Sequence, residues 1–264
     1  MHKVIWAALL LVAGGCSGNY ILTVPDQLAP AGGEATAVIR VQRNEFAGYP
    51  KAVKDSAIRF QVDGNELRAA YTDKKGYAGA AVPVGNKLGK FYLHVQHLDR
   101  TGVDAEAWAP CYVWDPQEYL VAVDLDGLPT GASAKDAAAA VSRVAKSAHV
   151  VYFTHEDVDE HGELRRRLEQ SGYPDGPVLK WQQEGWHVAR TKLNVPYLVI
   201  EPRLVSTLSP LRKQFPNFTA GICTRPLAAK AFAQAGLKVT VVGNAKADPS
   251  AAHLNNWSRV EFKP

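Results

Sequence analysis

The sequence contains little cysteine and no long hydrophobic run after its first residues. Three cysteines among 264 residues cannot form a dense disulfide framework, so burial of apolar side chains must stabilise the fold. No collagen-like period or low-complexity tract occurs among the 21 glycines and 16 prolines. With 47% hydrophobic and 21% charged residues, the chain has the composition of a globular protein, not of a disordered one.

An excess of one charge is also absent. Lys and Arg number 30 and Asp and Glu number 26, so the formal net charge is only +4. The basic residues are scattered singly among acids, which excludes a nucleic-acid-binding surface of the usual kind. The sequence has no HExxH, GxSxG, Walker lysine or GxGxxG pattern. A zinc protease, a serine-hydrolase elbow, a P-loop and a dinucleotide fingerprint therefore have no support.

The pattern of the N-terminus indicates a targeting segment. Lys3 precedes an apolar run over 4–13 that is too short to span a bilayer but suits the core of a signal peptide. The run closes on Ala-Gly-Gly and then Cys16, which resembles the lipobox of bacterial lipoproteins.

That resemblance implies a signal peptide over 1–15, cleavage before Cys16, a lipid on its sulfur and an acyl chain such as palmitate on its amino group. Residues 16–23 would form the lipidated tether, and the partner would be a membrane. The expected location is the bacterial cell envelope, and Ser17 after the cysteine implies the outer membrane where there are two. Plain secretion with cleavage elsewhere is the alternative.

The periodicity divides the rest of the chain in two. Over 24–115, short segments alternate apolar and polar residues, as in 35–41 and 57–62, and turn residues such as Asp63-Gly64 separate them. This pattern predicts an all-β, immunoglobulin-like sandwich. Over 119–264, apolar strands alternate with helical segments, which predicts a Rossmann-type, doubly wound α/β domain with a parallel sheet. The fold class is therefore that of a two-domain protein.

Polar side chains follow two of the predicted parallel strands. Asp124 and Asp126 come directly after the strand 119–123, and Thr154 ends the strand 150–153. The carboxyl ends of parallel strands form the usual ligand site of such a sheet. Two carboxylates in this position can act as nucleophile and as general acid or base, and they can bind a hard cation such as Mg²⁺. A polar strand exit without function is the alternative.

These residues, together with the stretch 172–179 and the segment 221–236, resemble the haloacid dehalogenase (HAD) superfamily, and within it the lipin-type phosphatidate phosphatases and the C-terminal domain of phosphatidylinositol transfer proteins. The resemblance implies a HAD-like α/β domain over 119–264. It also implies that Asp124 is a nucleophile forming a phospho-aspartate, that Asp126 is the general acid/base and that Thr154 contacts phosphate. Asp124 and Asp126 would then hold Mg²⁺.

Two parts of the family pattern are missing. Ala228 and Ala229 stand where the fourth-motif acid is expected, and Asp248 and Glu201 are the candidate replacements. The third-motif lysine is also absent. Arg203 and Lys180 are the candidates to supply its positive charge.

The predicted function is accordingly a membrane-anchored, partly degenerate phosphohydrolase. Its substrate would be a phosphorylated small molecule or a phospholipid. The alternative is an inactive HAD-like protein that acts as a binding module at the membrane, and a purely structural envelope protein is a third reading. Cys111 and Cys223 are either buried thiols or an interdomain disulfide.

Overall fold

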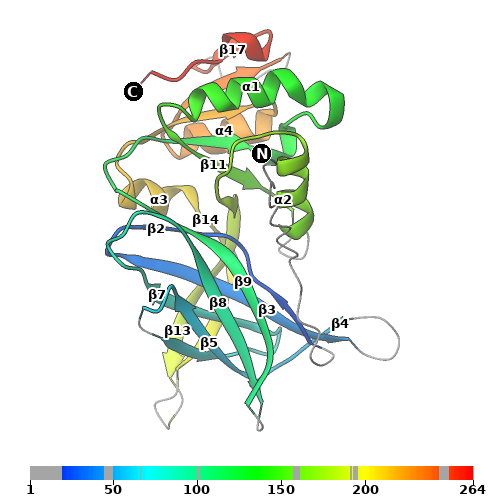
Figure 1. Ribbon diagram of the computed structural model, residues 1–264, viewed down its shortest axis with the longest axis vertical. Coiled ribbons are helices and arrows are strands. Elements are labelled where there is room, and N and C mark those ends of the chain that lie inside the picture. Colours follow the sequence, from blue (N-terminus) through cyan, green and yellow to red (C-terminus); the bar gives the residue numbers. More distant parts are fainter. Residues whose placement is uncertain are drawn as a thin grey trace, which may run out of the picture.

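The computed structural model describes the chain in eight segments (Figure 1). These are residues 20–44, 50–65, 67–99, 102–156, 161–190, 192, 196–243 and 250–263. Within these segments, the strands contain more residues than the helices. A β-sandwich occupies the lower part of the view, and a parallel sheet with its helices occupies the upper part.

Seven strands form the larger sheet of the sandwich, in the order β13-β14-β6-β5-β8-β9-β2. Their bounds are β2 (Gln27–Pro30), β5 (Ala57–Val62), β6 (Arg68–Tyr71), β8 (Gly89–Asp99), β9 (Gly102–Trp114), β13 (Gln182–Arg190) and β14 (Pro196–Ser206). The neighbours are antiparallel except for β2 with β9 and β14 with β6.

Four strands form the second sheet, with β3 at its centre. They are β1 (Tyr20–Thr23), β3 (Glu34–Asn44), β4 (Pro50–Ala52) and β7 (Tyr77–Pro83). Alternate residues of β3, such as Ile39 and Val41, point inward and are fully buried against Phe60 of the facing sheet. The period of two thus produces one apolar face on each sheet, and these faces make the sandwich core.

Six strands form the parallel sheet, in the order β12-β11-β10-β15-β16-β17. Their bounds are β10 (Leu120–Asp124), β11 (His149–Thr154), β12 (Val178–Lys180), β15 (Phe218–Cys223), β16 (Lys238–Val242) and β17 (Ala252–Leu254). The helices are α1 (Ala134–Val144), α2 (His161–Gln170), α3 (Leu208–Gln214) and α4 (Pro226–Gln234), and the short 3₁₀ turns are η1 (Leu125–Gly127), η2 (Gly131–Ser133) and η4 (Trp257–Arg259).

Both faces of this sheet are covered. Val121 and Val123 of β10 pack in one hydrophobic cluster with α1 and α2, whereas Leu120 and Ala122 pack in another with α3 and α4. The second cluster also contains Trp114, from the end of β9. The parallel sheet and the sandwich therefore share this second hydrophobic cluster, although the sandwich also has a core of its own.

The fold-class prediction is wrong in an instructive way. An all-β domain followed by a separate HAD-like Rossmann domain requires the second half of the chain to stay in the parallel sheet. Instead, the hairpin β13–β14 leaves that sheet and adds two strands to the sandwich, where Tyr197 pairs with Tyr71. The segment 196–200 is an apolar run, and such a run does not reveal which sheet it will join.

Within 119–264, the sequence pattern predicts helices over 203–214 and 249–257, and both differ in the structure. The segment 203–214 is helical only from Leu208, because its first residues continue β14. The segment 249–257 contains the short strand β17 rather than a helix. Cys111 and Cys223 are free, buried thiols, so the disulfide alternative is wrong. Burial raises the pKa of each to about 12, which makes both unreactive near neutral pH.

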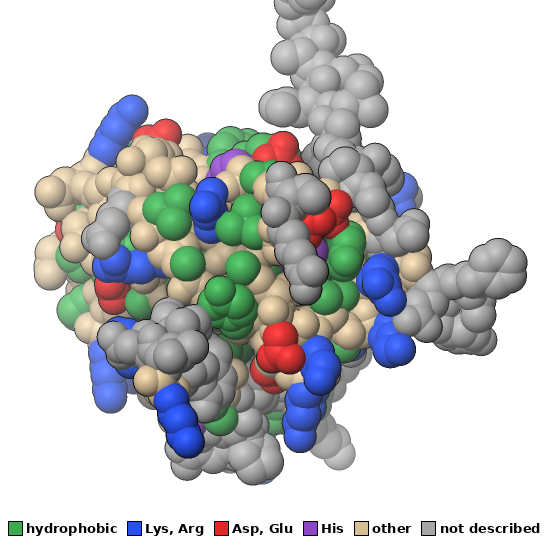
Figure 2. Space-filling view, turned by 90° about the horizontal axis from the view of Figure 1, so that it is seen from below, with side chains coloured by type: hydrophobic (Ala, Val, Ile, Leu, Met, Phe, Trp, Pro, Cys, Tyr) green, Lys and Arg blue, Asp and Glu red, His purple; other side chains and the backbone are tan. Residues whose placement is uncertain are grey.

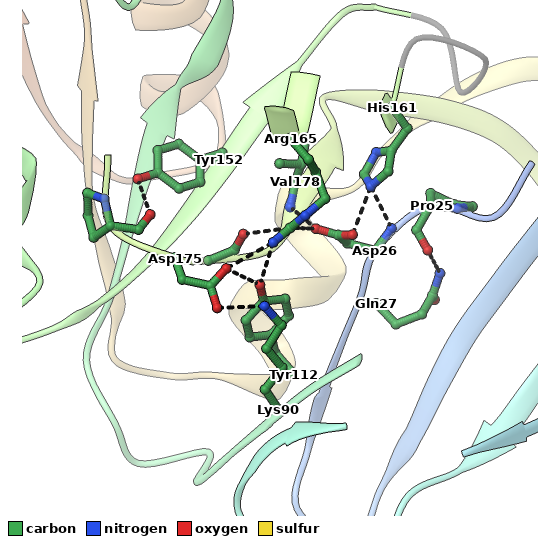
Figure 3. Close-up of polar contacts among 12 residues, drawn as sticks. Pro25, Asp26, Gln27, Lys90, Tyr112, Tyr152, His161, Arg165, Asp175 and Val178 are labelled. Atoms are coloured by element: carbon green, nitrogen blue, oxygen red, sulfur yellow. Dashed lines mark hydrogen bonds and ion pairs between the residues drawn. The ribbon is translucent and has the colours of Figure 1, made fainter. Parts of the chain in front are cut away.

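A polar cluster joins the two parts of the molecule (Figure 3). Asp26, just before β2, is fully buried, and its carboxylate accepts hydrogen bonds from Arg165 and His161 of α2 and from the Val178 backbone N–H. A buried carboxylate needs partners of this kind to offset its lost hydration. The cluster thus ties the start of the sandwich to the edge of the parallel sheet.

The same arginine continues the cluster toward β9. Its Nη2 lies 2.9 Å from Asp175 Oδ1, which also accepts a hydrogen bond from the Tyr112 hydroxyl at 2.7 Å. Lys90 Nζ lies 2.8 Å from Asp175 Oδ2. We call these residues, with Asp26 and His161, the clamp.

The far end of the sandwich is seen from below in Figure 2. Lys and Arg side chains stand around its rim, and hydrophobic side chains lie among backbone atoms toward the middle. None of the helices in the described ranges has the length and hydropathy needed to cross a membrane.

Candidate functional site

Asp124 ends β10 at the carboxyl edge of the parallel sheet, and its side chain is fully buried. Arg225, the residue before α4, grips it with two hydrogen bonds. Arg225 Nε lies 2.9 Å from Asp124 Oδ2, and Nη2 lies 2.5 Å from Oδ1. This is the bidentate geometry in which a guanidinium binds a carboxylate most strongly.

Asp126 completes the same network from the first turn after the strand. Its Oδ2 accepts hydrogen bonds from Arg225 Nη2 and from the His155 backbone N–H, both at 2.9 Å. Its Oδ1 accepts a hydrogen bond from the Thr154 hydroxyl. Asp124, Asp126, Thr154 and Arg225 form what we call the carboxylate cluster.

The turn after Asp124 has room only for glycine. A Cβ atom on Gly127 would lie 2.2 Å from Thr224 Oγ1 and 2.6 Å from Asp124 Oδ2. The Thr224 hydroxyl also donates a hydrogen bond to the Gly127 carbonyl at 2.9 Å. The absence of a side chain at Gly127 therefore lets the side chains of Thr224 and Asp124 approach its backbone, next to Arg225.

The electrostatics of the cluster follow from burial and from the arginine. Burial raises the pKa of the Asp124 carboxyl, while the hydrogen bonds and charge of Arg225 act in the opposite direction. The hydrogen bond to Asp124 raises the pKa of Arg225, which therefore stays protonated at any physiological pH. The positive charge that neutralises Asp124 is supplied by the protein itself.

This arrangement does not fit Mg²⁺. All four oxygens of Asp124 and Asp126 already accept hydrogen bonds, from Arg225, Thr154 or the His155 backbone. A magnesium ion requires such oxygens as ligands at close range. Within the described ranges, no group of three or more His, Cys, Asp or Glu side chains is arranged to hold a metal ion.

A cavity of about 560 Å³ lies beside this cluster, between the parallel sheet and the sandwich. The ends of β11 and β12 contribute His155 and Lys180, and β3 of the sandwich contributes Val38 and Ile39. The hairpin β13–β14 and α3 close it with residues that include Gln183 and Leu211. The hairpin that departs from the predicted fold is thus one wall of the cavity.

His155 connects the cavity to the cluster. Its backbone N–H binds Asp126, and its ring stacks on Trp181 with a centroid distance of 5.3 Å and an interplanar angle of 13°. Trp181 is itself buried between Phe153 and Phe232. A rigid aromatic floor therefore holds the imidazole at the cavity wall.

The structure brings some of the predicted site residues together and places others elsewhere. Asp124, Asp126 and Thr154 come together, and Lys180 pairs with Thr154 in the neighbouring strand. Arg203 lies within β14, in the seven-stranded sheet, and not at the start of a helix.

Four candidates have no described side chain or no described position. The side chains of Arg203 and Glu201 are not described, and Asp248 and Cys16 lie outside the described residues.

Sequence reasoning missed Arg225. This residue follows the end of β15, which pairs with β10, so its position beside Asp124 depends on the strand order. An arginine after a parallel strand is the one signal that could have marked it. His155 directly follows Thr154, and Trp181 holds its ring in place.

Comparison with known proteins gives only remote likenesses. No protein-family profile matches the chain, and no curated protein matches it. A carbohydrate acetylesterase from Xanthomonas citri is 14% identical over 84% of this chain and 60% of its own, with a TM-score of 0.34. A CARDB domain from Pyrococcus furiosus is 12% identical over 36% of this chain and 88% of its own, with a TM-score of 0.25.

Invasin, a bacterial integrin-binding protein, is 15% identical over 41% of this chain and 23% of its own, with a TM-score of 0.28. The chain thus spans well under two thirds of the invasin and somewhat less than two thirds of the esterase. Likenesses of this size carry no argument about activity.

None of these proteins is a haloacid dehalogenase or a lipin-type phosphatase, and the predicted membership of that superfamily is wrong. Three further predictions are therefore wrong: the HAD-type phosphohydrolase, its inactive HAD-like alternative and the description of the chain as phosphatase-like. The physical reason is that Asp-x-Asp after a strand is a weak motif. Parallel sheets of many kinds gather polar residues at the carboxyl ends of their strands.

Proposed function

We propose that this protein is a binding protein whose cavity between the parallel sheet and the sandwich holds a small molecule with an anionic group and an apolar body. The observation that carries the proposal is the position of the cavity, at the carboxyl ends of β11 and β12. Ligands of open α/β sheets bind in this crevice. Its volume of about 560 Å³ lies within the usual range for small-molecule sites.

The charges on the cavity wall favour an anionic ligand group. Among the residues that line it, the acidic side chain is that of Asp26, whose carboxylate is engaged by Arg165 and His161. Lys180 brings a positive charge to the wall, and the imidazole of His155 adds a hydrogen-bonding group. A phosphate or carboxylate group of the ligand would find hydrogen-bond donors here and would not face an uncompensated negative charge.

The rest of the wall suits an apolar body with a few polar groups. Val38, Ile39, Leu179 and Leu211 contribute aliphatic surface. The side-chain amides of three residues supply donors and acceptors, from Gln182, Gln183 and Gln214. This mixture of aliphatic surface with a few polar groups is typical of small-molecule sites.

We propose further that the protein works from the surface of a bacterial envelope membrane, anchored by lipid on Cys16. The support is the sequence alone, which sets small residues and Cys16 directly after a short apolar segment. Residues 1–19 lie outside the described structure.

The first test is a titration of the protein, residues 17–264, with 8-anilino-1-naphthalenesulfonate, an aromatic sulfonate that combines an anionic group with an apolar body. We expect saturable binding at one site, followed by fluorescence and confirmed by calorimetry. Lys180→Gln should weaken it about tenfold, because a charge-assisted hydrogen bond contributes about 1.5 kcal/mol or more. Val38→Phe, which places a larger side chain in the cavity, should also weaken binding.

Lys146→Gln is the matched control, because Lys146 is an exposed lysine that does not line the cavity. Its affinity for the probe should equal that of the unmodified protein. The proposal is overturned if the probe does not bind, or if it binds equally well after Lys180→Gln and Val38→Phe.

A further inference from the structure

The outward face of β8 and β9 carries two exposed aromatic rings. These long strands run side by side in the larger sheet of the sandwich (Figure 1). Tyr92 of β8 is 49% exposed and Trp108 of β9 is 50% exposed. Large aromatic side chains are normally well buried, so two neighbours that are half exposed on one sheet face need an explanation.

The tryptophan is held in place. His94 pairs with Trp108 across the strands, and the two rings stack with a centroid distance of 4.6 Å and an interplanar angle of 2°. His94 Nε2 lies 3.0 Å from Glu106 Oε2, which orients the imidazole. One face of the indole therefore rests on a fixed support, and little conformational entropy is lost when a ligand covers its exposed surface.

β1 lies beside β9 at this edge of the larger sheet without pairing with it. β9 pairs with β2 only over Cys111–Trp114, so within the described residues no strand pairs with β9 next to Trp108 on that side. Tyr92 lies one step along the same face, because it pairs with Pro110. The two rings are diagonal neighbours on the sheet, close enough for one extended ligand to touch both.

Planar polar side chains surround the rings on the same face. Gln96 pairs with Glu106 and with Arg59, and Gln61 pairs with His94. Because side chains alternate along a strand, all of these point outward together with the rings. The negative charge of Glu106 and the positive charge of Arg59 balance, so the face has no strong net charge.

From this face we infer that the sandwich binds a neutral polysaccharide chain, with sugar rings stacked on Trp108 and Tyr92. A pyranose ring presents an apolar C–H surface bordered by hydroxyl groups. The aromatic rings can pack on this C–H surface, and the amide, carboxylate and guanidinium groups can form hydrogen bonds with the hydroxyl groups.

A protein partner fits this face less well. A stable protein interface buries about 800 Å² on each side around an apolar centre. Here the apolar part of the described face consists of two rings with Pro110 between them, and charged and amide side chains surround it. The balance of Arg59 and Glu106 also gives no reason for a charged polymer. This site is separate from the cavity of the proposed function and does not depend on it.

Electrophoresis in native gels tests the inference. The gels contain hydroxyethyl cellulose, glycol chitin, mixed-linkage β-glucan or glycogen, and calorimetry with cellohexaose and chitohexaose gives affinities. We expect retardation by at least one of these glycans. Trp108→Ala and Tyr92→Ala should each weaken binding tenfold or more, whereas Trp108→Tyr should retain part of it.

Tyr119→Ala is the matched control, because Tyr119 is a 38%-exposed tyrosine that packs on Phe262 at the parallel sheet. It should bind like the unmodified protein. The inference is overturned if no glycan in the set retards the protein, or if Trp108→Ala leaves retardation unchanged. It is also overturned if sedimentation shows a dimer that Trp108→Ala dissociates, since the face would then bind a second copy.

Discussion

At the scale of single residues, Arg225 decides the character of the carboxylate cluster. Asp124 is fully buried and could not remain charged there without a partner. Arg225 satisfies both of its oxygens and one oxygen of Asp126. The ion pair of Asp124 and Arg225 therefore connects the end of β10 to the start of α4.

This ion pair predicts that the effects of Asp124 and Arg225 on the free energy of unfolding are strongly coupled. Arg225→Gln leaves a buried carboxylate without its counter-charge and should lower the free energy of unfolding by about 3 kcal/mol. The double variant Asp124→Asn, Arg225→Gln should recover most of this loss, because neither charge is then buried alone. Urea denaturation of the single and double variants gives the measurement.

Arg259→Gln serves as control for this experiment. Arg259 is exposed in the last short turn, and its loss should change the free energy of unfolding by no more than about 0.5 kcal/mol. Additive losses in the double variant, with no recovery, would show that the two side chains are not coupled.

Residue-scale reasoning from sequence succeeded where the chain itself sets the distance. Asp124 and Asp126 are two residues apart at a strand end, and Thr154 ends the next predicted strand, so their meeting could be expected. Arg225 is about a hundred residues away along the chain. Its approach depends on β15 lying beside β10, which no local pattern contains.

At the scale of elements, the clamp fastens α2 and β12 to the strands β2 and β9. Asp175 accepts hydrogen bonds from Tyr112, Arg165 and Lys90, which belong to three different elements. Although its partial burial acts in the opposite direction, these hydrogen bonds and charges hold the pKa of Asp175 below its usual value.

The lowered pKa predicts how the clamp responds to acid. A carboxyl with a lower pKa in the folded state stabilises the protein above its unfolded pKa of about 3.9, and this contribution disappears as the pH falls through the folded pKa. Asp175→Asn should therefore be less stable than the unmodified protein at pH 7, by no more than about 1 kcal/mol since the group is half exposed. The difference should be smaller at pH 3 than at pH 7.

Denaturant unfolding at the two pH values measures this effect, with Glu169→Gln, an exposed acid on α2, as control. A difference between Asp175→Asn and the unmodified protein that stays constant with pH would contradict the assignment.

Elements were predictable when their pattern was long and periodic. The alternation over 35–41 lies within β3, and the apolar run over 119–123 overlaps β10. The hairpin β13–β14 could not be predicted in this way, because β13 is mostly polar and the apolar run 196–200 of β14 is compatible with either sheet. Its place in the sandwich follows from the edge of β6 that it completes at Tyr71.

At the scale of the whole molecule, the sandwich and the parallel sheet act together. They share a hydrophobic core at Trp114, the clamp joins them at Asp26, and the cavity lies between them. A ligand in that cavity would touch both parts and would stabilise the whole protein by mass action.

The proposed anchor also belongs to this scale. The full-length protein should enter the detergent phase on Triton X-114 partitioning and incorporate labelled palmitate, whereas Cys16→Ser should do neither, because the acyl chains supply about 0.8 kcal/mol for each buried methylene. Ser17→Ala, one residue away, is the control and should behave like the unmodified protein. Equal partitioning of Cys16→Ser would refute the anchor.

The sequence by itself determined what depends on neighbours along the chain: the strand pattern of the sandwich, the buried strands of the parallel sheet and the group of Asp124, Asp126 and Thr154. Only the tertiary structure decided that Arg225 neutralises that group, that a late hairpin joins the sandwich and that a cavity forms between the two parts. Local periodicity sets which face of an element is apolar, whereas contacts between distant segments are selected by the packing of the complete core.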